Sequence, residues 1–412
     1  MEQTRSVEVA ATAQLRQPDR LVKWSVNNLR TQRAYRAKKS SASNDDSRLS
    51  PILKWPGGKE RELDQIFRFA PAKFKNYFDP FVGGGAVFTA FQAEHFFIND
   101  LSEELIGLYK SIATDDRHFF ETAHGISIAW GKLSVLSDAL FPEALRIYMQ
   151  CRKKECAILK EKVRHLLSLC EDMILDVASN VGEISFEEDL LDGICQKFSR
   201  MSALERRKGL LRRDDLKLNF ETALRSSFYV SLRRLYNSGF GKINRQALFF
   251  FVRNFAYSGM FRYNARGEFN VPYGGIGYNS KNLKKKLTYY QSDLLRHRLS
   301  NTTIENCDFE TFLRKYAPKK NDFVFLDPPY DTDFSTYARN EFSEKDQRRL
   351  AAYLTKECKA KWMLVIKHTD FIHSLYAKQE GVNIHSFEKK YAVSFMNRND
   401  QNATHLVVRN YD

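Results

Sequence analysis

Two short apolar runs, each followed by a carboxylate, predict buried strands of a parallel sheet. Residues 323–326 contain no polar side chain, as in a strand buried on both faces, and Asp327 comes next. Residues 95–99 form a second, mostly apolar run, which is followed by Asp100. Because open α/β sheets bind ligands at the carboxyl ends of their strands, we expect both carboxylates to lie at a binding edge.

Apolar residues at three- and four-residue steps predict helices in the first third and in the middle of the chain. A short amphipathic helix is expected at residues 63–70. Between about residues 130 and 225 the same spacing predicts a long helix, whose opposite face at 155–164 is charged. Its apolar positions are Leu145, Tyr148, Met149, Cys156, Leu159, Val163, Leu166 and Cys170. We interpret this region as a helical insertion packed on its own domain, with a coiled contact to a partner as the alternative.

Composition adds the size of the protein and the class of its partner. The chain has 412 residues, of which 43% are hydrophobic, and this length suits two domains or one domain with a large insertion. The formal net charge of +15 favours a polyanionic partner. The sequence has no run of about 18 apolar residues and no signal-peptide pattern, so we expect neither a membrane span nor secretion.

Six cysteines bear on metal binding and on the redox compartment. They are Cys151, Cys156, Cys170, Cys195, Cys307 and Cys358. Their spacing matches no paired metal-ligand pattern, and they are too sparse for a disulfide framework. We therefore expect no metal and a reducing, cytoplasmic location.

The first 48 residues differ from the rest. Seven Lys or Arg and no acidic residue lie between Arg20 and Lys39. We interpret this stretch as a basic, disordered tail, with an arm that tracks phosphates as the alternative. Acidic residues at Glu2, Glu8 and Asp19 argue against a transit peptide.

The residues Asp327, Pro328, Pro329 and Tyr330 suggest a specific chemistry. The prolines fix φ and remove two N–H donors, so the chain leaves the sheet and the Pro328 carbonyl is available as an acceptor. An exocyclic amine is a poor nucleophile because its lone pair is delocalised into the ring. The Asp327 carboxylate and the Pro328 carbonyl would draw its nitrogen toward sp³ geometry, and Tyr330 would stack on a base that has left the duplex. A simple strand-ending turn is the alternative.

Two glycine-rich stretches precede the helical region. Residues 53–59 place two glycines beside a tryptophan and between lysines, which suits a loop against a flat, negatively charged ligand. Residues 79–88 carry three successive glycines at a predicted strand-to-helix turn, where backbone amides approach nucleotides, although such turns also occur for packing reasons. Asp100, roughly 15 to 20 residues later, stands where an acidic group takes ribose hydroxyls.

These stretches, in this order, resemble the motifs of the Dam-like, D12-class, alpha-group DNA adenine-N6 methyltransferases. The matching segments are 53–59, 79–88, 98–100, 257–274 and 327–330, within resembling regions at roughly 51–108 and 247–412. The resemblance implies a doubly wound, Rossmann-like α/β sheet and S-adenosyl-L-methionine as the cofactor, without a metal. It also implies an inserted, mostly helical target-recognition domain that carries a β-hairpin. We expect a tail at 1–48, catalytic segments at 49–125 and 287–412, and the target-recognition domain at 126–286.

The resemblance implies roles for single residues. The catalytic set is Asp327, Pro328, Pro329 and Tyr330. The expected cofactor contacts are Trp55, Lys59, Phe81, Gly83, Gly85, Asp100, Asp308, Phe309 and Asp327. For Asp308 and Phe309 an ordinary strand end and helix cap is the alternative.

Residues 257–274 resemble the DNA-reading hairpin of this family. Arg262, Asn264 and Arg266 alternate around a turn at 265–267, which fits a two-stranded ribbon of the kind that the major groove admits. By resemblance Arg262 would read a guanine. The other expected contacts, to thymine methyls, to the vacated stack and to the rest of the duplex, come from Lys54, Tyr257, Ser258, Met260, Asn264, Arg266 and Pro272.

We expect methylation of adenine N6 in double-stranded DNA, first at GATC, by a monomer or weak dimer of bacterial or phage origin at the nucleoid. A restriction nuclease or a defence system is a further class of partner. An RNA or protein-amide methyltransferase would need no groove-reading hairpin, and a glutamine enzyme usually has Asn in place of Asp327. An N4-cytosine enzyme generally has Ser there. An inactive DNA-binding regulator is disfavoured because the expected catalytic positions are filled.

Overall fold

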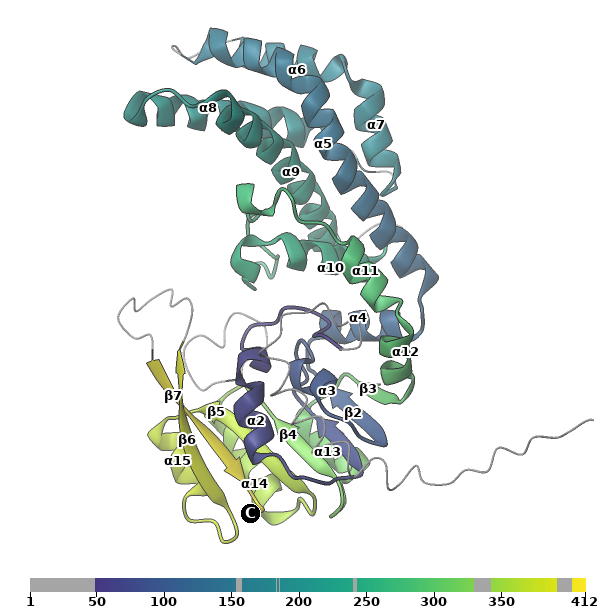
Figure 1. Ribbon diagram of the computed structural model, residues 1–412, viewed down its shortest axis with the longest axis vertical. Helices are drawn as coiled ribbons and strands as arrows, with labels where there is room; N and C mark the ends of the chain where they lie inside the picture. The colour runs from purple at the N-terminus through teal and green to yellow at the C-terminus, as the bar shows by residue number, and fades with distance from the viewer. Residues whose placement is uncertain are drawn as a thin grey trace, which may run out of the picture.

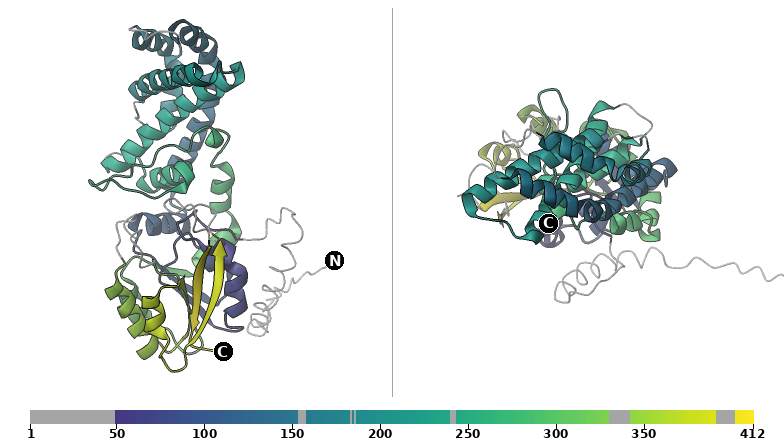
Figure 2. Two further views of the ribbon diagram at one scale, coloured as in Figure 1. Left: turned by 90° about the vertical axis from the view of Figure 1, so that its left-hand side faces the viewer. Right: turned by 90° about the horizontal axis from the view of Figure 1, so that it is seen from above.

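The computed structural model describes residues 49–152, 158–182, 184, 186–239, 243–329, 342–390 and 402–412, with side chains to 388 and again from 404. These residues form a sheet domain and a curved helical arm that projects from one end of it (Figures 1 and 2). The expected fold class, an α/β sheet with a helical insertion, is confirmed.

One seven-stranded sheet is the centre of the lower domain, with the order β3-β2-β1-β4-β5-β7-β6. Its strands are β1 (Asn76–Asp79), β2 (His95–Asn99), β3 (Thr302–Glu305), β4 (Phe323–Leu326), β5 (Lys361–Lys367), β6 (Asn383–Lys390) and β7 (Asn402–Arg409). The strands from β3 to β5 are parallel, and β7 runs antiparallel to both of its neighbours. β1 and β2 precede the arm in sequence and the other five follow it, so distant parts of the chain build one sheet.

The two strands expected from apolar runs are confirmed as β4 and β2. All four residues of β4 are buried in the middle of the sheet. The order β2-β1-β4 places three carboxyl groups at neighbouring carboxyl ends: Asp100 directly after β2, Asp79 at the end of β1, and Asp327 directly after β4. This is the edge at which open α/β sheets bind ligands.

Helices cover both faces of the sheet, because alternate residues of each strand point to opposite sides. Phe323 and Phe325 face an apolar cluster shared with α2 (Leu63–Phe69), α3 (Ala86–Ala90) and α4 (Glu103–Ala113). Val324 and Leu326 face a second cluster. That cluster is shared with α13 (Phe309–Tyr316), α14 (Glu344–Lys356) and α15 (Asp370–Tyr376). The helix expected at 63–70 is confirmed as α2.

The arm consists of helices, joined to the sheet domain through α11 (Lys284–Tyr290) and α12 (Asp293–Ser300). Its helices are α5 (Arg117–Cys151), α6 (Leu159–Ser168), α7 (Glu171–Ser179), α8 (Glu187–Lys208), α9 (Arg213–Ser238) and α10 (Arg245–Phe255). The single long helix expected over 145–170 is wrong. α5 ends at Cys151, and α6 packs back on α5 and α8, which buries Val163 and Leu166. The expected boundary at residue 126 falls within α5.

Residues 257–274 form a shorter and less regular hairpin than expected. Two isolated antiparallel bridges, Ala256 with Tyr273 and Tyr263 with Phe269, hold it together. A 3₁₀ turn, η2 (Tyr257–Gly259), interrupts the pairing, and Ser258 has a left-handed φ of 52°. At the other end of the chain, β7 pairs with β6.

Candidate active site and nucleic-acid interface

Asp79 is a buried carboxyl group between two other carboxylates. Its side chain accepts hydrogen bonds from the Tyr77 hydroxyl at 2.9 Å and from the backbone N–H of Phe81 at 3.2 Å. Burial above all, and to a smaller extent the negative charges of Asp327 and Asp100, raise the pKa of Asp79 to about 8 against the opposing effect of those two donors. We did not identify Asp79 as a site residue from sequence, although its place at the end of a strand was the available signal.

Asp327 forms an ion pair with Lys59. The Lys59 Nζ lies 2.5 Å from the Asp327 Oδ1 and 3.1 Å from the carbonyl oxygen of Gly57. Lys59 is only 2% exposed, so this contact is shielded from water on the lysine side. We assigned Lys59 to the cofactor by resemblance and did not anticipate that it holds the carboxylate of Asp327.

The turn after β4 is described as far as Pro329. The Gln347 side chain, fully buried on α14, donates to the Pro329 carbonyl at 3.0 Å. No described residue donates a hydrogen bond to the Pro328 carbonyl. Tyr330, the fourth residue of the expected catalytic set, lies outside the described residues.

The glycine-rich loop is packed tightly against protein atoms. Gly85 has a left-handed φ of 80° and precedes α3. A side chain at Gly84 would collide with the Leu53 carbonyl, and one at Gly83 would meet the Trp55 ring. Packing therefore accounts for these glycines, and it places the loop directly beside the segment 53–55.

Asp100 fastens the same loop to the end of β2. Its Oδ2 accepts the Gly83 N–H at 3.0 Å, and its Oδ1 accepts the Ser102 N–H at 2.9 Å. The Tyr109 hydroxyl donates to the Gly83 carbonyl at 3.1 Å. The structure thus brings Asp100 and Gly83 together, as expected for one binding edge.

Phe81 and Phe309 lie in an aromatic cluster near the end of β1. Their ring centroids are 5.6 Å apart, and each lies 5.5 Å from the Phe342 ring. Asp308 caps α13 by accepting the Glu310 N–H at 3.0 Å, and it pairs with Arg349 at 2.8 Å. The helix-cap alternative for Asp308 is therefore what the structure shows, while Phe81 and Phe309 form an apolar wall.

The chemistry of this edge fits S-adenosyl-L-methionine. That molecule carries a positive sulfonium and a positive ammonium group, and the side chains of Asp100 and Asp327 lie at the ends of β2 and β4. Its adenine ring is flat and apolar on its faces, as the wall of Phe81, Phe309 and Phe342 requires. Among the described residues, no group of three or more His, Cys, Asp or Glu side chains is arranged to hold a metal ion.

The hairpin exposes most of the residues expected to contact DNA. Arg262, Ser258, Arg266 and Pro272 are exposed, and Tyr257 is 48% exposed. The Arg262 Nε donates to the Asn270 side chain at 2.9 Å, which directs its guanidinium. Met260 is half-buried and Lys54 is exposed.

Asn264 has a different place from the one expected. Its Oδ1 accepts the backbone N–H groups of Arg266 and Glu268 at 3.0 and 2.9 Å, and its Nδ2 donates to the Glu268 carboxylate at 2.7 Å. These bonds hold the turn of the hairpin. The Asn264 side chain therefore stabilises the turn of the hairpin.

Arg253 joins the hairpin to the segment 53–55. Its guanidinium donates to the carbonyls of Met260 at 2.7 Å, Gly259 at 3.3 Å and Lys54 at 3.3 Å. It also lies 4.5 Å from the centroid of the Phe261 ring and 5.5 Å from that of Trp55. We did not predict this role, although an arginine directly after the apolar run 247–252 of α10 was a visible signal.

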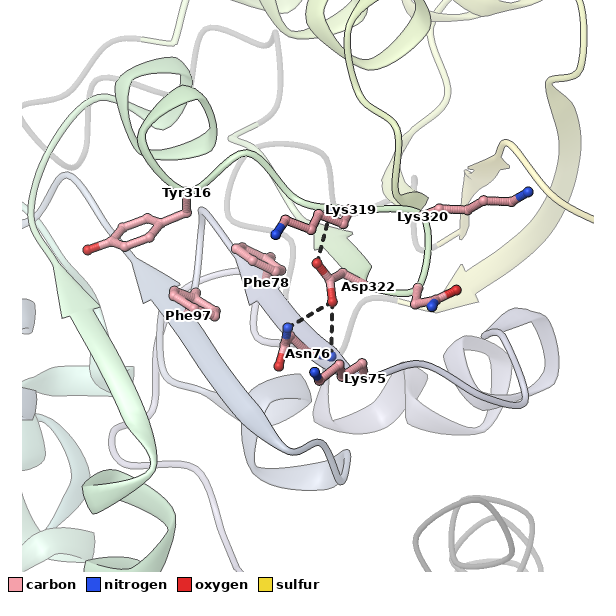
Figure 3. Close-up of a pocket in the computed structure, with 9 residues that line it drawn as sticks. Lys75, Asn76, Phe78, Phe97, Tyr316, Lys319, Lys320 and Asp322 are labelled. Carbon is pink, nitrogen blue, oxygen red and sulfur yellow. Dashed lines mark hydrogen bonds between the residues drawn. The ribbon is translucent and has the colours of Figure 1, made fainter. Parts of the chain in front are cut away.

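A cavity of about 410 Å³ lies at the opposite edge of the sheet (Figure 3). Lys75, Lys319 and Lys320 line it, and Asp322 accepts hydrogen bonds from Asn76 at its base. Because Asn76 begins β1 and Asp322 precedes β4, the cavity lies at the amino ends of the strands. It is therefore separate from the carboxylates at the other edge.

Comparison with known proteins identifies a family. The sequence profile described as "D12 class N6 adenine-specific DNA methyltransferase" matches residues 55–130 and 207–393. The gap between these ranges, 131–206, falls on the greater part of α5 and on α6, α7 and most of α8.

Individual relatives match over most of their length. The type II methyltransferase M.CviBI of Paramecium bursaria Chlorella virus NC1A is 26% identical over 374 residues, 88% of this chain and 100% of that protein. The DNA adenine methylase of Haemophilus influenzae is 25% identical over 338 residues, 79% of this chain and 82% of that protein. The type II methyltransferase M.MjaIII of Methanocaldococcus jannaschii is 28% identical over 360 residues, 82% of this chain and 90% of that protein. None of the helices described here is long and apolar enough to span a membrane.

Proposed function

Because the chain belongs to the D12 class of N6 adenine-specific DNA methyltransferases, we propose that it methylates adenine N6 at a short, specific site in double-stranded DNA, with GATC as the site. S-Adenosyl-L-methionine is the proposed methyl donor, and the adenine is flipped out of the duplex. One observation carries this proposal. The segment 54–59 contacts the hairpin at one end, through Arg253, and Asp327 at the other, through Lys59.

The proposed chemistry depends on two acceptors after β4. The Asp327 carboxylate and the Pro328 carbonyl accept hydrogen bonds from the two N–H groups of the adenine amine. The amine nitrogen is thereby drawn toward sp³ geometry, and its lone pair is less delocalised into the ring. Lys59 fixes the position of the carboxylate. When bound, S-adenosyl-L-methionine supplies an electrophilic methyl group. Asp327 acts by alignment and need not be a strong base, since the amine becomes acidic once it is methylated.

Recognition is proposed to occur through the hairpin in the major groove. Arg262 is exposed and directed by Asn270, which suits a bidentate contact to guanine worth about 1–3 kcal/mol of discrimination. Met260 and Pro272 contact thymine methyls, and Tyr257 fills space near the flipped base. Arg253 donates hydrogen bonds to both the hairpin and the segment 54–59, and so fixes the hairpin relative to the segment that contacts Asp327.

The test uses unmethylated plasmid, the full chain and S-adenosyl-L-methionine. After incubation the DNA is digested with a nuclease that cuts GATC only when its adenine is methylated. We expect cutting that requires both protein and cofactor. Methyladenine found elsewhere by modification-sensitive sequencing would keep the reaction and overturn the site, whereas no methyladenine at all would overturn the proposed function.

A further inference from the structure

We propose that the turn between α8 and α9 binds the phosphate backbone of the substrate DNA about one helical turn away from the bases read by the hairpin. This inference rests on the proposed function and adds a second contact to it. The profile of the family matches from residue 207, so most of α8 lies outside the matched part of the chain, whereas the turn after it and α9 lie inside.

The turn carries a cluster of exposed cations. It consists of Arg206, Arg207, Lys208, Arg212 and Arg213. Arg212 lies 3.9 Å from Asp214, but no other member has an acidic partner within ion-pair distance among the described residues. Glu205, the acidic residue inside the cluster, is buried and bonded to Arg152 and to the Leu211 N–H.

Helix electrostatics explains only half of this cluster. Cations in the last turn of α8 interact favourably with the negative end of its dipole. Arg212 and Arg213, however, stand at the N-terminal end of α9, where the dipole favours anions and where the exposed Asp214 and Asp215 follow in the first turn. A binding partner with many negative charges accounts for both halves.

The turn is held at a fixed distance from the hairpin. α9 has 26 residues and is therefore about 39 Å long. At its C-terminal end, Asn237 exchanges hydrogen bonds of 2.8 and 2.9 Å with the backbone of Phe269, and Arg233 donates to the Val271 carbonyl at 2.9 Å. One turn of B-DNA spans about 34–36 Å, so a duplex read at the hairpin reaches the turn after about one helical repeat.

The cationic turn and the hairpin lie on the same side of the molecule. In Figure 1 the outer end of α8 and the hairpin, coloured green, both reach toward the left of the molecule, and Figure 2 shows this side facing the viewer. α8 is tied to α9 by the Ser227 hydroxyl, which donates to the Asp189 carbonyl at 2.7 Å. The two helices therefore present the cations as one unit.

The test variant combines Arg207→Ser, Lys208→Ser and Arg213→Ser. The matched control combines Lys75→Ser, Lys319→Ser and Lys320→Ser, which removes the same charge at the cavity of Figure 3. Binding to a duplex of about 12 bp centred on the methylated site is compared with binding to one of about 40 bp, over a range of salt concentrations. Methyl transfer to the short duplex is measured in parallel.

On the long duplex, the slope of the logarithm of the binding constant against the logarithm of the salt concentration should be smaller in magnitude for the arm variant than for wild type, by about two to three. Each lost phosphate contact accounts for about 0.9 of this difference. On the short duplex, the arm variant and wild type should bind and react alike, and the control should match wild type on both. Equal loss on both duplexes, or no loss on either, would overturn the proposal. If wild type itself methylates neither duplex, it is the proposed function that has failed.

Discussion

At the scale of single residues, the site depends on charges that burial brings together. Lys59 and Asp327 form an ion pair, and Asp79 lies buried near Asp327 and Asp100. A buried charge is costly unless it is paired, so each of these groups has its protonation or its position set by its neighbours. The three carboxyl groups therefore differ in their surroundings: Asp327 is paired with Lys59, Asp79 has a raised pKa, and Asp100 accepts the Gly83 N–H.

Asp327→Ala removes the proposed acceptor for the adenine amine. We expect methyl transfer to fall below detection, because the amine nitrogen stays conjugated with the ring, while specific DNA binding remains close to wild type. Radiolabelled methyl incorporation and a mobility-shift assay give the two readouts. Turnover at the wild-type rate would exclude the proposed alignment by Asp327.

Asp79→Asn tests the raised pKa of a buried carboxyl group. Because the pKa of Asp79 is about 8 in the folded chain and about 4 in the unfolded chain, the folded state binds more protons between those values. Its contribution to the free energy of unfolding therefore falls as pH rises from about 4 to about 8. Asparagine does not titrate, so the variant should lose less stability over this range.

Urea unfolding midpoints at several pH values, measured side by side for both proteins, check this expectation. A variant whose midpoint falls with pH as steeply as that of wild type would show that Asp79 does not titrate in this window.

At the scale of elements, the hairpin and the loop at 53–55 act as one unit through Arg253. Burial lowers the pKa of Arg253 to about 10, so the guanidinium is still charged at neutral pH. Its hydrogen bonds fix the backbone on both sides of the interface. The reading surface is thus positioned from beneath by a side chain that is 3% exposed.

Arg253→Met keeps much of the volume and removes the donors to the carbonyls of Met260, Gly259 and Lys54. Unpaired buried acceptors cost roughly 1–3 kcal/mol each, so we expect some loss of stability. The KM for DNA should rise more than kcat falls, and the preference for the correct site over sites that differ by one base should drop at least several-fold. Arg253→Lys should recover part of that preference. Lower stability with an unchanged preference would point to packing alone.

Sequence patterns predicted helices and strands better than they predicted contacts between side chains. The apolar residues 323–326 specify β4 because every one of them is buried, and the helical spacing at 63–70 gives α2. Periodicity does not show where a helix turns back, so the break between α5 and α6 was missed. The ion pair between Lys59 and Asp327 joins residues 268 positions apart, and only the assembled sheet brings them together.

At the scale of the whole molecule, the proposed cofactor edge is built from both parts of the chain. Asp100 and Gly83 come from before the arm, whereas Asp327 and Phe309 come from after it. A ligand bound across this edge therefore stabilises the assembled sheet.

S-Adenosyl-L-methionine at about one hundred times its dissociation constant should raise the free energy of unfolding by about 2.7 kcal/mol. Differential scanning calorimetry with and without the cofactor checks this through the midpoint temperature of unfolding. S-Adenosyl-L-homocysteine should raise that midpoint as well. An unchanged midpoint at saturating concentration would show that neither molecule binds the folded protein.

The sheet, which is built from two distant parts of the chain, also affects how the protein is made. β1 pairs with β4 through Tyr77 and Phe323, so the ribosome releases β1 and β2 long before their partner exists. The arm between them consists of helices with local contacts, which form quickly. Once folded, the arm holds α4 against α10 and α5 against α11, and this shortens the loop that β4 must close. During synthesis the folded arm would therefore lower the entropic cost of pairing β4 with β1.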